Sequence, residues 1–364
     1  MANLQTARKR IVIATEATYG VDQVNIIHGD GDLDLIYQDV SGTPTINPGR
    51  ELVEIDRARS SNSGVPHKSL PRGTDVEIVF PLTGRAAAGA GNEAPYWSPA
   101  LIAAGHSETI VSDATATYAP KSASAPGMTV YLYHEQDDGK QRLQRATGVR
   151  GNLNFVLELD QEARAEFSGR GIYVDYLSDE AQFFSATTGA AALEADGSTA
   201  GTARDAGDEK YAAKPPIMVR GITASINGNS WCISGMNLNT NKTVSERLCA
   251  TGAAGLKEVV LTRGSGQRAG GSFTLDTDDT SVIDDFIDLY ETADEFAISV
   301  VLTEGDGSSG SETVTFSATR AQIGAPGMGD NSGLVQFDIP FFVNGDFSDL
   351  FQDDDYAVAF GEVA

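Results

Sequence analysis

Alternation of hydrophobic and polar residues runs through most of this chain and predicts short strands that each bury one face. The pattern is clear from Thr74 to Leu82, where Val76, Ile78 and Phe80 share a side, and it returns from Met128 to Glu135. Gly, Asn, Asp, Ser and Thr are frequent between such stretches, as turns require. We therefore expect a mainly β protein.

The longest alternating stretch, from Gly148 to Val174, is predicted to form an antiparallel hairpin with one buried face. The expected buried residues are Leu153, Phe155, Leu157 and Leu159 on the first arm, and Ala163, Ala165 and Phe167 on the second. The opposite face is polar and meets water. Its candidate functional residues are Asn152, Asn154, Glu158 and Glu166.

The first of two predicted helices covers residues 98–105. Ser98 is expected to be the N-cap, and Pro99 fits the first helical position. Gly105 can end the helix in a left-handed turn.

The second predicted helix covers residues 280–292, where Ser281 and Asp284 have the spacing of a capping box. One apolar stripe is expected along it, formed by Val282, Ile283, Phe286, Ile287, Leu289 and Tyr290.

The elements are expected in the same order in both halves: a Gly-flanked strand, a short helix, another strand and an alternating pair. We interpret this as two tandem β-sandwich or barrel domains, each with one short flanking α-helix. The first is residues 1–184 and includes a long irregular loop over 41–73. The second is residues 215–364 and ends in an acidic tail. Residues 185–214, rich in Ala, Gly, Ser and Thr, form a linker or a surface excursion.

Charge narrows the classes of function. The chain has 51 Asp and Glu against 26 Lys and Arg, a formal net charge of −25, which argues against binding nucleic acid through its phosphates. Two cysteines cannot form a disulfide framework and favour a reducing compartment. The start has no signal-peptide core, and no stretch has membrane-spanning length, so we expect synthesis and folding in a cytoplasm.

Motifs for catalysis or metal binding are incomplete. "RGSGQRAGGS" lacks the Lys and Ser/Thr of a phosphate loop, and "GDGDLDLI" lacks the glycine and the glutamate of a calcium loop. The four histidines are scattered and have no zinc-ligand companions. We predict a protein without enzymatic activity, cofactor or metal.

Five segments, taken in order, suggest a family: "IVIATEATYGVD", "NEAPYWSPALIAAGHSET", "TYAP", "VRGNLNFVLE" and "PPIMVRGITASINGNSWCISGMNLN". Over nearly the whole chain they resemble the major tail tube proteins of long, flexible-tailed (siphovirus-type) bacteriophages, of the two-domain type. That family shows an early "ETxYG", an "aPaW…LLxAcGf" helix, an "RGxxxF" strand and a later "PP…G". The chain departs from the pattern at Ile102, Ala103 and His106, and its linker is longer.

The resemblance implies a structural virion protein that polymerises into stacked rings around a channel for genome delivery. Three chains would form a pseudo-sixfold ring in the virion tail, assembled in the host cytoplasm. The implied partners are further copies of the chain and the tail tip or baseplate, tape measure and tail terminator proteins. Genomic DNA would pass through the lumen without specific binding.

Within such a ring, the polar hairpin face is the candidate lumen surface, and an acidic lumen would repel DNA phosphates. Basic residues of the long loop are the candidates for contacts between rings, against acidic loops such as Asp353–Asp355. These candidates are Arg57, Arg59, His67, Lys68 and Arg72.

Two other classes of function stay open. A capsid decoration protein would be another virion β protein, and it would attach to shells without forming tubes. A carbohydrate-binding or hydrolytic β-sandwich would need exposed clustered aromatic side chains or a carboxylate pair in a cleft.

Overall fold

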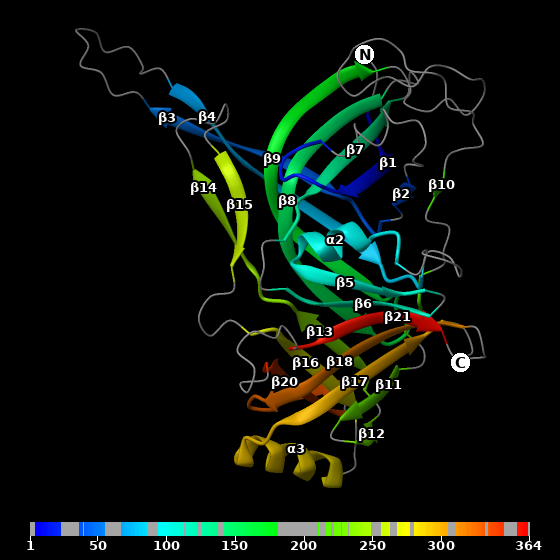
Figure 1. Cartoon of the computed structure of the whole chain (residues 1–364). Helices are drawn as coiled ribbons and strands as arrows, with labels where there is room; N and C mark the ends of the chain where they lie inside the picture. The colour runs from blue at the N-terminus through cyan, green and yellow to red at the C-terminus, as the bar shows by residue number, and fades with distance from the viewer. Residues whose placement is uncertain are drawn as a thin grey trace.

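The computed structural model describes the chain over the following residues: 4–22, 36–38, 40–54, 67–85, 94–112, 114–121, 125–136, 141–180, 210–211, 216–219, 222–226, 228–231, 233–248, 256–262, 268–276, 280–304, 311–331, 334–345 and 355–362. Within these ranges the protein is mainly β, as the alternation predicts, and its strands form a large, mostly antiparallel sheet (Figure 1).

The elements up to residue 180 are β1 (Leu4–Thr15), β2 (Ile36–Gln38), β3 (Thr45–Glu54), β4 (His67–Pro81), α2 (Ser98–Ala103), β5 (His106–Val111), β6 (Thr115–Pro120), β7 (Met128–Gln136), β8 (Gln141–Glu158) and β9 (Arg164–Glu180).

The later elements are β10 (Lys210–Tyr211), β11 (Ile222–Ile226), β12 (Asn229–Trp231), β13 (Gly235–Asn239), β14 (Thr243–Leu248), β15 (Leu256–Thr262), β16 (Gly270–Asp276), α3 (Thr280–Thr292), β17 (Phe296–Thr303), β18 (Glu312–Ile323), β19 (Gly327–Asn331), β20 (Leu334–Val343) and β21 (Ala357–Glu362).

One order of antiparallel neighbours occurs twice along the chain. In the first half it runs β1–β7–β8–β9–β4–β3. In the second half it runs β11–β17–β18–β20–β16–β13. In each half the helix follows the fifth strand of this order, since α2 follows β4 and α3 follows β16. Each half also sends out a two-stranded ribbon, the outer part of β3–β4 or the pair β14–β15 (Figure 1).

In the described part of the chain, paired strands join the two halves, and an isolated antiparallel bridge between Glu162 and Met218 adds to them. β8 of the first half pairs with β13, and β6 pairs with β21, whose other neighbour is β18. As a result, a single sheet face runs through β3, β4, β9, β8, β13, β16, β20 and β19.

Aromatic side chains from both halves meet in one core. The Trp97 ring stacks on Phe80 at a centroid distance of 5.9 Å and meets the edge of Phe360 at 5.8 Å. Phe155 of β8 meets Phe316 of β18 at 5.1 Å. Large buried aromatic rings supply much of the apolar area that stabilises a core, so these contacts hold the halves together.

Helix α2 has the predicted position but a different start. Trp97 is its N-cap, with no side-chain capping bond, and Ser98 is already helical. The Ser98 hydroxyl instead bonds to Tyr118, so the N-cap prediction for Ser98 is wrong. Gly105 has a φ of 83°, which confirms the predicted left-handed turn.

Helix α3 covers the predicted residues 280–292, and because it begins at Thr280, Ser281 lies inside the helix and is not its N-cap. The predicted stripe is only partly buried. Phe286 is in the core, whereas Ile287 and Tyr290 are 40% and 45% exposed. α3 packs against β18 and, through Phe286, against Trp231 of β12, and the stripe is wider than these contacts.

Three other expectations need correction. Within the predicted loop over 41–73, residues 45–54 and 67–73 belong to strands β3 and β4, and residues 55–66 lie outside the described residues. Pro48 and Pro71 flank a register shift of this ribbon near the sheet edge. The acidic tail contains β21, which is inserted between β6 and β18 with Phe360 buried. Leu159 is 49% exposed because the chain turns after β8.

The predicted segment 185–214 lies outside the described residues except for β10. This short strand pairs in parallel with β2 of the first half. None of the helices in the described ranges is long and apolar enough to span a membrane.

Candidate interaction surface

The polar side of the sheet that runs from β3 to β19 is the main candidate surface, and we call it the polar face. Directly opposed residues in an antiparallel ladder point to the same side. One row of the polar face crosses from the first half to the second through Arg164, Val156, Asn237, Ser272 and Pro340. The predicted hairpin face is therefore only the first part of a larger surface.

All four predicted hairpin residues lie on the polar face. Asn154 is opposite Glu166 on β9 and Asn239 on β13, and its Nδ2 donates to the Glu166 carboxylate at 3.0 Å. Glu158, at the end of β8, is exposed. Their grouping follows from the strand period of two, which sequence alternation reveals.

Asn152 differs from the others because its amide is used inside the fold. Its Nδ2 donates to Oδ1 of Asn239 at 2.8 Å, and its Oδ1 accepts from the Thr240 hydroxyl at 2.6 Å and the Lys242 backbone N–H at 2.9 Å. These bonds tie β8 to the turn after β13. Asn241 takes a φ of 49° in that turn. Asn152 thus fixes the junction between the halves and is a poor candidate for contact with a passing ligand.

Acidic groups on the polar face are partly balanced by arginines. Arg164 lies between Glu158 and Glu166, at N–O distances of 3.8 and 3.4 Å. Arg170 approaches Asp75 at 2.9 Å. Exposed pairs of this kind contribute little to stability. They do reduce the local negative charge that Glu158 and Glu166 alone would give to the polar face.

Residues of the second half were missed by sequence reasoning. Asn237, Ser272, Thr274 and Asp338 extend the same face over β13, β16 and β20. Asn237 Nδ2 donates to the Ser272 hydroxyl at 3.0 Å. The strands carrying them alternate in the sequence, but their pairing with β8 joins residues distant along the chain and has no local signal.

The predicted contacts between rings are placed only in part. Arg57 and Arg59 lie outside the described residues. His67, Lys68 and Arg72 are on β4, where His67 and Lys68 pair with Glu54 and Val53 of β3. These three residues belong to the outer ribbon and not to an irregular loop.

The acidic segment expected to meet those bases is also corrected. Asp355 is 9% exposed and immediately precedes the buried strand β21. A carboxylate buried in this way is not available to a basic loop of another chain. Asp353 and Asp354 lie outside the described residues.

The "EATYG" segment, part of the resemblance to the tail tube family, contributes to a buried cluster around Glu16. The Glu16 carboxylate accepts from the backbone N–H groups of Gly148 and Gly20, both at 2.6 Å, and from the Thr129 hydroxyl at 3.0 Å. Burial raises the pKa of Glu16 although these bonds oppose the rise. Gly148 has a φ of 61°, and a Cβ there would lie 2.7 Å from the Tyr19 ring.

Tyr19 and Arg150 connect this cluster to the β14–β15 ribbon. The Arg150 guanidinium lies 4.3 Å from the Tyr19 ring centroid. Arg150 donates to the Val259 carbonyl at 2.6 Å, and the Val259 N–H donates to the Tyr19 hydroxyl at 2.5 Å. Burial raises the pKa of Tyr19 to about 12. The cluster fixes the ribbon of the second half against the sheet of the first.

His106, where the chain departs from the family pattern, is buried and fully bonded. Its Nδ1 lies 2.8 Å from the Leu101 carbonyl oxygen and its Nε2 lies 2.7 Å from the Tyr356 hydroxyl. The histidine therefore joins α2 to the segment before β21. Among the described residues, no group of three or more His, Cys, Asp or Glu is arranged to hold a metal ion.

No protein-family model matches the chain, and no curated protein matches it.

Proposed function

We propose that this chain is a structural virion protein that polymerises into stacked rings and forms the tail tube of a long-tailed bacteriophage, the channel through which the genome is delivered. The observation that carries the proposal is the sheet that passes without interruption from β3 to β19 through both halves. A wall segment of a tube needs a continuous sheet of this kind.

The repeated strand order supports a duplicated tube domain. Within the described residues, each half has the same sequence of antiparallel neighbours, a helix after the fifth strand and a projecting ribbon. Two such units in one chain would let three chains form a ring with pseudo-sixfold symmetry, because closed rings of like subunits satisfy every interface. The two helices would then be the same brace, used once in each unit.

The two edges of the sheet support ring closure. Among the described residues, β3 has its ladder with β4 and β19 has its ladder with β20, so the outer edge of each carries no described strand. Met328 of β19 is 78% exposed although its cross-strand partner Phe337 is buried. An edge strand with an exposed apolar side chain is a template for pairing with another chain. Joining β19 of one chain to β3 of the next would cover both edges.

The polar face supports the lumen assignment. Its described charged residues are Asp75, Glu77, Glu158, Glu166, Asp338, Arg164 and Arg170, with the buried Arg150 opposite Arg170. Acidic residues outnumber basic ones here, and Arg164 and Arg170 are paired with carboxylates. These described residues include no exposed cluster of unpaired Lys or Arg, so they offer DNA phosphates little adhesion.

The proposed mechanism is mechanical. The continuous sheet would give a stiff wall. The polar side chains on its inner face would let DNA move through the channel without binding it. Adjacent rings, a tape measure protein during assembly, and tip and terminator proteins at the two ends would complete the tube.

Negative-stain electron microscopy of the purified protein tests the proposal. We expect rings or hollow tubes in the wild type. Met328→Asp should stop ring closure, because it places a carboxylate on the interface edge, and its circular dichroism should match the wild type since the side chain is exposed. Val21→Asp, at a side chain 42% exposed in the segment after β1, is the control and should still assemble. Monodisperse globules from the wild type under all conditions would refute the proposal.

A further inference from the structure

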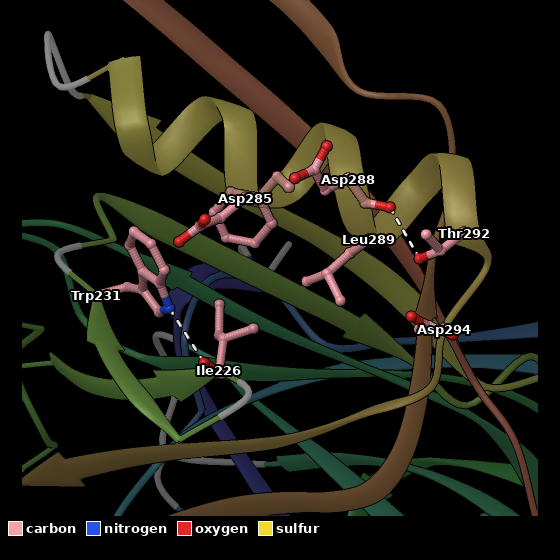
Figure 2. Close-up of a pocket in the computed structure, with 8 residues that line it drawn as sticks. Ile226, Trp231, Asp285, Asp288, Leu289, Thr292 and Asp294 are labelled. Carbon is pink, nitrogen blue, oxygen red and sulfur yellow. Dashed lines mark hydrogen bonds between the residues drawn. The ribbon is translucent and has the colours of Figure 1, made fainter.

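A pocket of about 270 Å³ lies between α3 and the β11–β12 hairpin. Figure 2 shows the helix crossing above it, with the Trp231 ring at one end and Asp294 at the other. Its lining residues are Ile226, Trp231, Asp285, Phe286, Asp288, Leu289, Thr292 and Asp294. None of them belongs to the polar face.

The pocket combines an apolar floor with an acidic rim. Trp231 is half-buried, packs on Phe286 at a centroid distance of 5.2 Å, and donates its Nε1–H to the Ile226 carbonyl at 3.2 Å, which fixes the ring. Asp285, Asp288 and Asp294 are exposed and supply the rim. Such a site suits an extended peptide that presents both apolar side chains and cations.

The surroundings of the pocket strengthen its negative charge. Residues 280–295 contain Asp284, Asp285, Asp288, Glu291, Asp294 and Glu295, and no Lys or Arg. Ile287 and Tyr290 on the same helix leave apolar surface exposed. A helix that is both apolar and uniformly acidic at the surface favours a basic partner over a second acidic surface.

This chain contains a segment of the complementary composition. Residues 57–72, "RARSSNSGVPHKSLPR", have four Lys or Arg and no Asp or Glu in a chain of net charge −25, and include Val65 and Leu70. The segment spans the connection of the β3–β4 ribbon and the start of β4. The ribbon and α3 lie at opposite ends of the molecule (Figure 1). Head-to-tail stacking would bring the ribbon of one chain to the α3 end of another, and such a heterologous contact repeats along a filament.

We propose that the α3 pocket of one chain receives residues 57–72, the basic segment that leads from β3 into β4, from a chain in the adjacent ring. This inference rests on the proposed tube function. It names an acceptor other than the buried Asp355. Trp231 is assigned as the apolar contact, and Asp285 and Asp288 as the anionic contacts.

A peptide titration tests the contact without any tube. The probe is a synthetic peptide of residues 57–72, added to the soluble full-length chain while tryptophan fluorescence is recorded. Trp97 is 2% exposed, so the signal that changes should come from Trp231, and Trp231→Phe should abolish it. We expect saturable binding that weakens as salt rises from about 50 to about 300 mM, because screening shortens the range of surface electrostatics.

Matched variants distinguish the effect of the pocket carboxylates on peptide binding from the effect of the overall negative charge of α3. Asp285→Asn with Asp288→Asn should weaken peptide binding at least about fivefold, the effect of losing surface ion pairs. Asp284→Asn with Glu291→Gln removes the same charge from the same helix outside the pocket lining and should change it much less. A peptide carrying Arg57→Glu and Arg59→Glu should not bind.

Tube length gives the second readout. Asp285→Lys with Asp288→Lys should shorten or abolish tubes, as should Arg57→Glu with Arg59→Glu, and combining all four should restore them. Wild-type protein that never forms rings or tubes would overturn the proposed function itself. Wild-type tubes with no peptide binding, or full-length tubes from the pocket variant, would overturn only the pocket assignment.

Discussion

At the scale of single residues, Arg85 places a buried positive charge between the halves and bonds to groups of both. It is 1% exposed, and its Nε and backbone N–H donate to Glu312 at 3.0 and 3.2 Å. Its Nη2 donates to Glu362 at 2.5 Å and its Nη1 to the Ala114 carbonyl at 3.2 Å. Burial alone would lower the pKa of Arg85, but the bonds to the two glutamates outweigh it and raise the pKa. The guanidinium therefore stays charged inside the fold.

Arg85→Met should destabilise the protein strongly, because it leaves the buried Glu312 carboxylate without its cation. We expect a loss of about 3–5 kcal/mol in the free energy of unfolding, measured by urea denaturation. Arg247→Gln is the control, since the Arg247–Glu258 pair is 61% and 25% exposed and its loss should cost at most about 1 kcal/mol. Equal losses in the two variants would show that the buried pair has no special role.

Glu16 should make stability depend on pH. Its pKa is raised in the folded protein by burial, so the fold favours the protonated carboxyl. The stabilising contribution is complete below the ordinary value of 4.5 and is lost as pH rises through the raised pKa. The unfolding free energy of the wild type minus that of Glu16→Gln should therefore fall as pH increases above about 4.5.

Urea denaturation at several pH values measures this difference. Tyr19→Phe is the control that keeps Glu16, and because Tyr19 titrates near 12 it should keep the wild-type slope between pH 4.5 and neutrality. A constant difference between the wild type and Glu16→Gln across that range would contradict the assignment.

At the scale of elements, the periodicity of the sequence predicted individual strands and helices but not the pairing of distant strands. The hairpin β8–β9 and helix α3 are found where the pattern places them. The outer β3–β4 ribbon was not predicted as strands because its sequence contains Gly and Pro. An edge ribbon tolerates prolines that a central strand would not. Strand β21 was not predicted because acidic residues precede it and suggest an exposed tail. Its burial depends on pairing with the distant strands β6 and β18.

The close approach of β13 and β16 gives a test at this scale. A Cβ on Gly271 would lie 1.8 Å from the Asn237 carbonyl oxygen, a distance that only a backbone shift can relieve. Gly271→Ala should therefore lower the free energy of unfolding by about 1–3 kcal/mol or more. Gly329→Ala on β19, where the nearest atom is at 3.8 Å, should change it by less than about 1 kcal/mol. Thermal and urea unfolding of both variants decide the matter.

At the scale of the whole molecule, the halves are interlocked although their strand order repeats. One buried cluster includes Trp97 and Phe155 from the first half with Phe316 and Phe360 from the second. The candidate site could be predicted only up to residue 166, because alternation shows which side chains share a face and cannot show that β8 will pair with β13. That pairing is what converts two polar faces into one.

A shared core predicts one cooperative unfolding transition. Far-ultraviolet circular dichroism, which reports all strands, should coincide with the fluorescence of Trp231→Phe, which reports Trp97 in the first half. Two separated transitions would mean that the halves are independently stable and that the contacts between them contribute little.

The insertion of β21 between β6 and β18 should be a slow step of folding. Tyr118 and Val358 are ladder partners, and about 240 residues separate them along the chain. Loops of that size close slowly, so the barrier to reaching the native state should be dominated by this late step. Until it occurs, β6 and β18 each keep one unpaired edge along the residues that pair with β21. Exposed strand edges of this kind favour association with other chains. The fully paired sheet would thus form only after β21 has been inserted between β6 and β18.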